Sequence, residues 1–487
     1  DNHSGIVDIY RNCKGNPSTF TYYTQPLYVA VSPRTQFVHL PGKVPVDFYI
    51  VNEKNLSGKY RLSVSVCTPD GKEGKHIEKE VHITGGDCFG QLLLENCQLA
   101  IEGASGLYQV KAQLRNTSGH LCAEGKDEVL GIYWDEKQLK GKGALYGTPD
   151  DPVATFYQKA TGCELPAFRS DMEKLDWIVV TRSSLDAPQP VPVEAFCQKE
   201  GKSVLELSLY KDDDLRTLAG VTQDNKIDRT FADGAQPDPL LPANQSFSAI
   251  WDGKLKAPQS GTYMIGVTSD QGMRLSVNGQ RIVDEWRNNK ELTVVRPFLL
   301  KAGDEVAVRV EYSQRNPTGS VQLVWSLPDH AAIAPQELLD RVREDGTSLL
   351  LLKSAESWMD AVSAYTGSAY HGYYSVGKNW VGGVHFVKEH PLFNGLPVNV
   401  AMGWPYQALV RNGDRRLGLH IDNEELVAGS YSSAPFNLGS AVGIISCGKG
   451  KIYYSTLDLV DNLNNPAAAA DVARKLFCNF ILLSKDR

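Results

Sequence analysis

An α/β pattern that stops near residue 202 and resumes near residue 335 constrains the fold of this chain more than any other feature. Before the break, Pro152 opens a helical stretch, and residues 177–180 form the continuous apolar run of a strand covered on both faces. After it, residues 335–343 form an amphipathic helix and residues 349–352 a second buried strand. A domain can be inserted at an exposed loop when its own ends lie close together. We therefore predict one α/β domain that is split by an insertion.

The segment between the two halves, residues 203–328, has the two-residue apolar period of β-strands. Tyr263, Ile265 and Val267 alternate with other residues, and a similar alternation follows further on. Asn278-Gly279 is a strong hairpin signal, because both turn positions need a positive φ. We predict that this insertion is an all-β sandwich.

Residues 28–135 show the same period and precede the α/β part. Short alternating runs are separated by turn signals such as Pro69-Asp70-Gly71, a spacing typical of an immunoglobulin-like β-sandwich. The inward positions are Val44, Val46, Phe48, Ile50, Tyr60, Leu62, Val64, Val66, Tyr108, Val110, Ala112 and Leu114. The fold class is therefore multidomain, α/β plus all-β, with the α/β domain spanning residues 136–202 and 329–487.

Composition narrows the function classes. A chain of 487 residues is too long for one core, and its net charge of −7 gives no electrostatic reason to bind nucleic acid or anionic lipid. No apolar run reaches the roughly 18 residues that a membrane span needs. The nine cysteines form no C-x-x-C pair, which argues against a zinc site.

The opening residues resemble the end of a family-2 glycoside hydrolase barrel. The resemblance is carried by residues 4–8, 10–12, 14–17, 22–23 and 25–31. It implies that residues 1–27 are the end of a catalytic barrel or a linker. It also implies that the two catalytic carboxylates lie upstream, so that no residue of this chain is catalytic. We expect the parent protein to be bacterial, and secreted, periplasmic or outer-membrane-associated.

The inserted segment resembles the lectin-like domain first named from anthrax protective antigen. The matching residues are 241–244, 247–248, 251–253, 258, 260–263, 268–272, 274–275, 277–279, 282–284 and 286. The resemblance implies that loops around Asp270, Gln271 and Asn278 bind an oligosaccharide or polysaccharide. Sugar-binding members often place two adjacent Asp on a calcium ion. Here the second is Gln271, so calcium at Asp270 stays open as a cofactor.

The split domain resembles the class I glutamine-amidotransferase-like fold, a flavodoxin-like architecture. The strings at residues 390–397 and 448–452 carry this resemblance. Working members place a nucleophilic Cys just after the strand at 349–352, where this chain has Lys353-Ser354. We therefore expect a degenerate, structural domain.

Two tryptophans of the α/β part are further candidates for sugar contact. Trp380 and Trp404 lie in glycine-rich stretches, and pyranose C–H faces suit aromatic planes. Together these observations predict the non-catalytic, glycan-binding and scaffolding part of a glycosidase acting on β-linked glycans. Its partners would be a glycan and the upstream catalytic domain. Two alternatives remain: a hydrolase with its own site in the α/β domain, and a pure carbohydrate-binding adhesion module.

Overall fold

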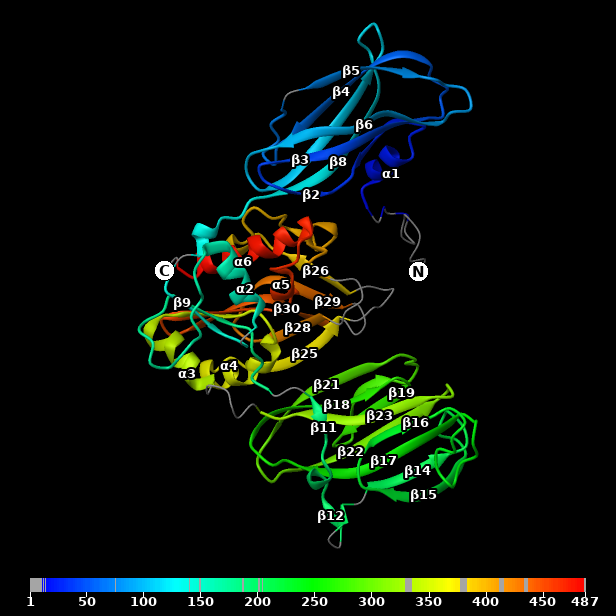
Figure 1. Cartoon of the computed structure of the whole chain (residues 1–487), viewed down its shortest axis with the longest axis vertical. Helices are drawn as coiled ribbons and strands as arrows, with labels where there is room; N and C mark the ends of the chain where they lie inside the picture. Colours follow the sequence, from blue (N-terminus) through cyan, green and yellow to red (C-terminus); the bar gives the residue numbers. More distant parts are fainter. Residues whose placement is uncertain are drawn as a thin grey trace.

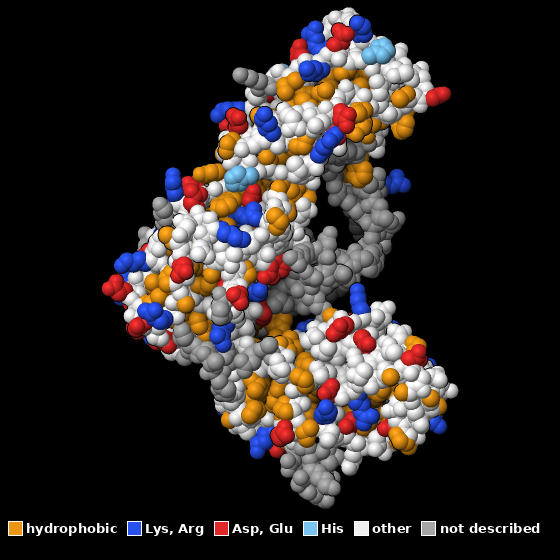
Figure 2. All heavy atoms as spheres, viewed as in Figure 1, with side chains coloured by type: hydrophobic (Ala, Val, Ile, Leu, Met, Phe, Trp, Pro, Cys, Tyr) orange, Lys and Arg blue, Asp and Glu red, His pale blue; other side chains and the backbone are white. Residues whose placement is uncertain are grey.

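The structure is a computed structural model that describes residues 11, 13, 15–74, 76–139, 141–148, 150–185, 188–199, 202–203, 205–328, 335–376, 383–410, 416–432 and 437–485. Figure 1 shows an N-terminal β part, a middle part that carries most of the helices, and the inserted β part, arranged one after another along the long axis. Side chains of both charge signs are interspersed over the visible face (Figure 2). The molecule is mostly β-sheet.

The N-terminal part is a β-sandwich that follows the short helix α1 (Pro17–Tyr23). The predicted inward residues Val44, Val46, Phe48 and Ile50 are all fully buried, which confirms the two-residue period. Tyr60 and Val66 are only partly buried. One sheet has the order β1 (Leu27–Pro33), β3 (Gly42–Asn52), β6 (Gly90–Ile101), and the other β2 (Phe37–His39), β8 (Leu121–Ile132), β7 (Gly106–Arg115), β4 (Gly58–Cys67), β5 (Ile77–Ile83).

The middle part is built on one mixed sheet. Its parallel section has the order β31 (Gly450–Ser455), β24 (Ser348–Leu351), β10 (Trp177–Val180), β9 (Gly143–Tyr146). Beyond β31 the sheet continues with antiparallel strands: β30 (Asn437–Cys447), β29 (Glu425–Ser432), β26 (Gly383–Val387) and β27 (Val400–Ala401), with β28 (Arg416–Ile421) and β25 (Tyr370–Val376) branching from β30.

Helices cover both faces of the parallel section. Trp177 and Val179 point to a core shared with α2 (Pro152–Thr161), α5 (Leu459–Asn462) and α6 (Asp471–Leu483). Ile178 and Val180 point to the opposite core, shared with α3 (Pro335–Asp340) and α4 (Met359–Thr366). The apolar run at 177–180 is therefore buried on both sides, as the sequence predicts. The finer flavodoxin-like assignment is not confirmed by this mixed sheet.

The inserted part is a second β-sandwich. Its two inner faces share one core that includes Trp251, Tyr263, Val310 and Leu323. One sheet has the order β15 (Leu218–Asp224), β14 (Leu205–Tyr210), β17 (Phe247–Lys256), β22 (Glu305–Gln314), β19 (Gly272–Val277), β20 (Gln280–Glu285). The other contains β11 (Gln189–Pro190), β23 (Gly319–Ser326), β18 (Gly261–Ser269) and β21 (Leu292–Leu300), with β16 (Asp228–Phe231) on β23.

The chain enters and leaves this sandwich at one place. Leu185 and Pro328 form an antiparallel bridge, and β11 pairs with β23 through Gln189 and Trp325. The ends of the insertion are therefore adjacent, which lets β10 and β24 pair directly in the host sheet. No helix among the described residues is long and apolar enough to cross a membrane.

A buried carboxylate joins the N-terminal sandwich to the middle part. Asp471, the first residue of α6, is 5% exposed. Its Oδ1 accepts from Trp134 Nε1 at 3.0 Å and from Arg474 Nη1 at 2.6 Å, and its Oδ2 lies 3.2 Å from His39 Nδ1. The Phe37 ring of the N-terminal sandwich and the Trp404 ring of the middle part also meet edge to face, with centroids 5.5 Å apart.

Trp134→Phe tests this junction, because it keeps an aromatic ring near Phe156 but removes the donor to Asp471. We expect about 1–2 kcal/mol of destabilisation, seen in calorimetry as a lower unfolding midpoint. The matched control is Asp461→Asn, which breaks an exposed pair with Lys353 and should cost about 0.5 kcal/mol or less. Equal shifts in the two variants would contradict this role.

Candidate functional site: a polar cavity in the inserted sandwich

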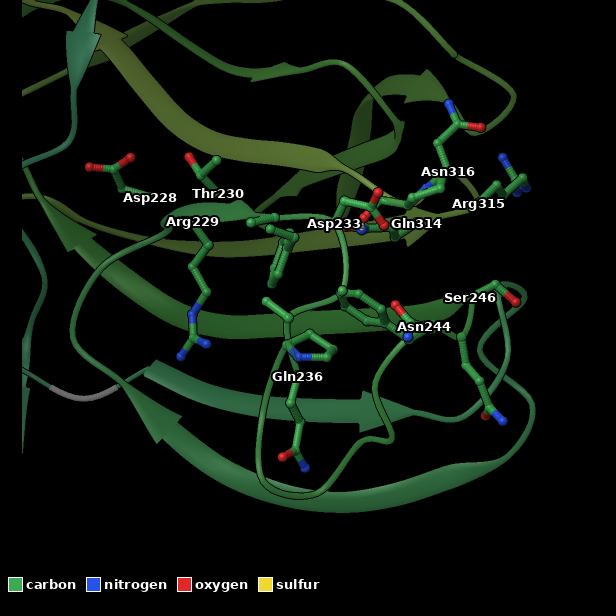
Figure 3. Close-up of a pocket in the computed structure, with 18 residues that line it drawn as sticks. Asp228, Arg229, Thr230, Asp233, Gln236, Asn244, Ser246, Gln314, Arg315 and Asn316 are labelled. Atoms are coloured by element: carbon green, nitrogen blue, oxygen red, sulfur yellow. Dashed lines mark hydrogen bonds between the residues drawn. The ribbon is translucent and has the colours of Figure 1, made fainter.

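A cavity of about 740 Å³ opens at one end of the inserted sandwich. Its wall comes from three segments that are distant in the sequence, and Figure 3 shows their side chains arranged around the hollow. These segments are β16 with the loop to residue 237, residues 244–247 leading into β17, and residues 314–317 leaving β22. A volume of this size is in the range of pockets that take small ligands.

Phe231 and Phe247 form the floor of the cavity, and the buried ring of Tyr312 packs against both of them. Phe231 stacks on Tyr312 with ring centroids 5.5 Å apart, and it meets Phe247 edge to face at 5.0 Å. Burial, and then the charge of Asp270, raise the pKa of Tyr312. The Tyr312 hydroxyl therefore stays protonated and donates to Gln314 Oε1 at 2.6 Å, which fixes the orientation of the Gln314 amide at the cavity wall.

The long loop between β16 and β17 is held by its own contacts. Gln236 Nε2 donates to the carbonyl of Leu241 at 2.9 Å. Asn244 has a φ of 58°, in the left-handed region that Asn adopts more readily than most residues. These features keep the carboxamide of Asn244 at the mouth of the cavity.

Several polar side chains at the rim are uncommitted. Within the part of the chain that the structure describes, none of these side chains has a hydrogen bond or an ion pair, and all are exposed: Asp233, Asn244, Gln245, Ser246 and Asn316. Amide and hydroxyl groups that are free to donate and accept are suited to binding a polar, hydroxyl-rich ligand. The rim can thus exchange water for ligand hydroxyls without breaking internal contacts.

The other charged side chains of the wall are paired. Arg229 Nε binds Asp224 at 2.8 Å, and Arg315 Nε binds Asp213 at 2.9 Å. Lys226, and then Gln322, hold the pKa of Asp228 below its usual value. Arg315 Nη2 is buried and has no hydrogen-bond partner among the described residues. Among the described wall residues, Asp233 is the charge without a partner.

Asp270 and Gln271 lie behind this wall. Gln271 is 3% exposed; its Oε1 accepts from the Arg315 amide at 3.2 Å and its Nε2 donates to the Thr318 carbonyl at 3.1 Å. Asp270 Oδ1 accepts from the Ser320 amide at 2.7 Å and hydroxyl at 3.2 Å. The two predicted site residues are therefore together, and both contact the segment that leads from the cavity wall into β23.

The other predicted site residues lie elsewhere. Asn278 is in the hairpin at the far end of β19, about 20 Å along the strand from Gln271, where its Oδ1 accepts from Ala307 N at 3.0 Å. Trp404 is partly buried against Phe37 in the middle part. Trp380 lies outside the described residues. The structure does not bring Asn278 or Trp404 to the cavity.

A calcium ion at Asp270 does not fit these contacts. Calcium needs several oxygen ligands, but one Asp270 oxygen and the Gln271 amide oxygen are already hydrogen-bonded to backbone N–H groups. The carboxylates of the acidic run at residues 212–214 are also engaged, with backbone amides, Arg315 and Trp286. No cluster of three or more His, Cys, Asp or Glu that could hold a metal occurs among the described residues.

The α/β part shows weaker signs of a functional site than this cavity does. Ser354 has a φ of 53° in the turn after β24, but no His or acidic side chain of the described residues bonds its hydroxyl. His390 Nδ1 accepts from the Leu392 amide at 3.2 Å and so caps the turn at residues 391–393, and burial lowers the pKa of His390. His371 pairs instead with Asp422 at 3.0 Å, so these two histidines do not share a site.

A family model for the PA14 domain matches residues 201–338. The sequence prediction of a protective-antigen-type, lectin-like domain is thereby confirmed for the inserted part. The match covers less than a third of the chain, and the family-2 glycosidase and amidotransferase resemblances are not shown by it.

Individual relatives share only part of the chain. The anti-sigma-I factor RsgI3 of Acetivibrio thermocellus is 29% identical over 117 residues, 24% of this chain and 18% of that protein. A solved PA14 sugar-binding domain from an RTX adhesin is 18% identical, with a TM-score of 0.21, covering 27% of this chain and 92% of that one. An anti-sigma factor domain-containing protein is 14% identical, with a TM-score of 0.23, covering 62% and 86%. The TM-scores are too low to carry an argument.

The sequence does not predict the rim residues as a site, although Asn244 belongs to a segment that resembles the lectin-like domain. They lie in loops without periodicity. The turn-rich composition of residues 232–246 predicts a long loop, but it does not predict that this loop forms the wall of a cavity.

The acidic run at residues 212–214, beside the cavity, leads to a prediction about how stability depends on pH. Burial opposes ionisation of Asp212, but hydrogen bonds from Arg216, Asp214 and Thr217 outweigh it and lower its pKa to about 2. A depressed pKa stabilises the fold above the unfolded value of about 3.9, and this contribution disappears as the pH falls toward about 2.

Asp212→Asn should therefore lower the unfolding midpoint at neutral pH and flatten its fall between about pH 4 and pH 2. Calorimetry of both proteins across this window measures the difference. Asp238→Asn, in the same sandwich, is the control, because the Asp238 carboxylate accepts from one backbone amide, that of Leu240, whereas Asp212 accepts from three. Parallel pH profiles for wild type and Asp212→Asn would contradict the assignment.

Proposed function

We propose that the inserted sandwich binds a glycan in the cavity between residues 228–237, 244–247 and 314–317. The observation that carries the proposal is a polar rim with free amides and hydroxyls above an aromatic floor, in a segment that matches the PA14 domain. Sugar hydroxyls can bond to the amide and hydroxyl groups of this rim, and an apolar C–H face can contact the small exposed part of Phe231.

For the whole chain we infer the role of a non-catalytic, glycan-binding and scaffolding part of a secreted bacterial glycosidase that acts on β-linked glycans. The support is the family-2 resemblance of the opening residues, which implies an upstream catalytic domain. The N-terminal sandwich and the middle part, joined through Asp471, would then hold the glycan-binding module at a set position relative to that domain.

The alternative of a hydrolase site in the α/β part has weaker support. A nucleophile at Ser354 needs a base beside it, and the described residues supply none that is bonded to it. The alternative of a pure adhesion module shares the glycan-binding cavity and differs only in what lies upstream.

Glycan binding is tested on a glycan array with the whole chain. Wild type is compared with a double variant that combines Asn244→Ala and Asn316→Ala. Each substitution removes hydrogen bonds at the rim, so we expect the double variant to lose about tenfold or more in affinity. Gln280→Ala is the matched control. It deletes an exposed amide at the far hairpin of the same sandwich and should bind like wild type. The proposal fails if wild type binds no glycan on the array.

Hydrolysis is tested with aryl β-galactoside, β-glucuronide and β-mannoside. We expect no turnover by this chain and turnover by a version extended upstream, because the acid/base and nucleophile carboxylates are expected there. Ser354→Ala should leave the activity of the extended version unchanged. Turnover by the present chain that a single Asp or Glu substitution within residues 136–487 abolishes would favour the hydrolase alternative.

A further inference from the structure

We infer that the cavity binds a neutral glycan without a metal ion, and that Gln271 and Asp270 act as an internal hydrogen-bonded support for the cavity wall. This inference rests on the proposed glycan-binding function. It assigns to the two residues a positioning role in place of the calcium-binding role that the lectin-like resemblance implies for this loop.

The support is a set of hydrogen bonds between two loops far apart in the sequence. Gln271 bonds to both the Arg315 amide and the Thr318 carbonyl. Both ends of the turn at residues 315–318, called the wall turn, are therefore bonded to one side chain. Asn288 in turn donates to the carbonyls of Ser269 and Gln271, each at 3.2 Å. The wall turn is thus connected to a third segment through Gln271.

Asp270 supports the next residues along. Its carboxylate accepts from Ser320, and Ser269 Oγ donates to the Ser320 carbonyl at 2.6 Å. The start of β23 is therefore bonded on both its amide and its carbonyl side. Gly319 lies between, and a Cβ there would clash with Tyr312, Gln314 and Gln271, so the two loops approach as closely as glycine permits.

These contacts conflict with a calcium role. The Gln271 side chain is buried and bonded at both ends of its amide, so its oxygen reaches a cation only if the side chain moves, and that movement weakens the bond to the Arg315 amide that holds the wall. A buried N–H left without a partner costs free energy comparable to that of the lost hydrogen bond. A cation bound by the Gln271 oxygen would therefore disturb the contacts that hold the wall.

The rim determines the class of ligand. Three free carboxamides, Asn244, Gln245 and Asn316, can each donate to and accept from neighbouring hydroxyls of a pyranose. The nearby arginines are paired with Asp224 and Asp213, whereas Asp233 is unpaired among the described wall residues. An unpaired carboxylate repels an anionic sugar, so the geometry favours neutral pyranosides over uronates.

The first test titrates the whole chain with the methyl β-glycosides of galactose, glucose, mannose and xylose, and with methyl β-glucuronide, in excess EDTA and in excess calcium. Saturation-transfer NMR detects weak binding. We expect at least one neutral glycoside to bind equally in both conditions, with Asn316→Ala weakening it about threefold to tenfold and Gln280→Ala not at all.

The outcomes separate the inference from the function. Binding only with calcium overturns the metal-free inference and leaves the proposed function standing. Preferential binding of methyl β-glucuronide overturns the neutral class. If no glycoside binds in either condition, the proposed function fails and the inference fails with it.

The second test concerns the positioning role. Gln271→Glu keeps the oxygen that accepts from Arg315 but sets a second oxygen against the Thr318 carbonyl, and Gln271→Ala removes both contacts. We expect faster hydrogen–deuterium exchange at residues 314–318 in both variants, larger in Gln271→Ala, together with weaker binding of the neutral glycoside in calcium and in EDTA alike. Unchanged exchange there, or tighter binding of Gln271→Glu with calcium, would overturn the assignment.

Discussion

Antiparallel pairing between the chain that enters the inserted sandwich and the chain that leaves it is the constraint on which the rest of the structure depends. Leu185 opposes Pro328, and Gln189 opposes Trp325, so the two ends meet at one point. Because they meet, β10 and β24 lie side by side with Trp177 opposite Ser348, although 170 residues separate them in the sequence. The parallel section of the host sheet, and the cores on its two faces, follow from that pairing.

The sequence predicts burial better than it predicts pairing. The alternation at Val44 to Ile50 and the apolar run at 177–180 report which side chains meet a core, and both are buried as predicted. Periodicity does not report which strand lies next to which, so the antiparallel extension beyond β31 could not be anticipated. The cavity could not be predicted either, because its three wall segments, residues 228–237, 244–247 and 314–317, are distant in the sequence and meet only through tertiary folding.

The insertion also occupies a particular edge of the host domain. It follows the last residue of β10 and precedes α3, which places it at the carboxyl ends of the parallel strands. This is the edge at which open α/β sheets usually bind their ligands. Ser184 donates there to the Ser357 hydroxyl, and Thr262 of the inserted sandwich donates to Asp360 of α4. The edge that carries Ser354 is thus partly taken up by contacts with the linker and the inserted sandwich, while the polar cavity lies in the insertion itself.

The paired entry and exit strands have a mechanical consequence. If a glycan chain fixed to a surface holds the inserted sandwich, tension reaches the host domain through two strands that depart from the same point. Pulling them away together loads the contact of Thr262 with Asp360, which crosses the junction, whereas the Leu185–Pro328 bridge joins the two strands to each other and moves with them. The tension is then shared by two backbone strands, one continuous with β10 and the other leading to α3 of the host domain.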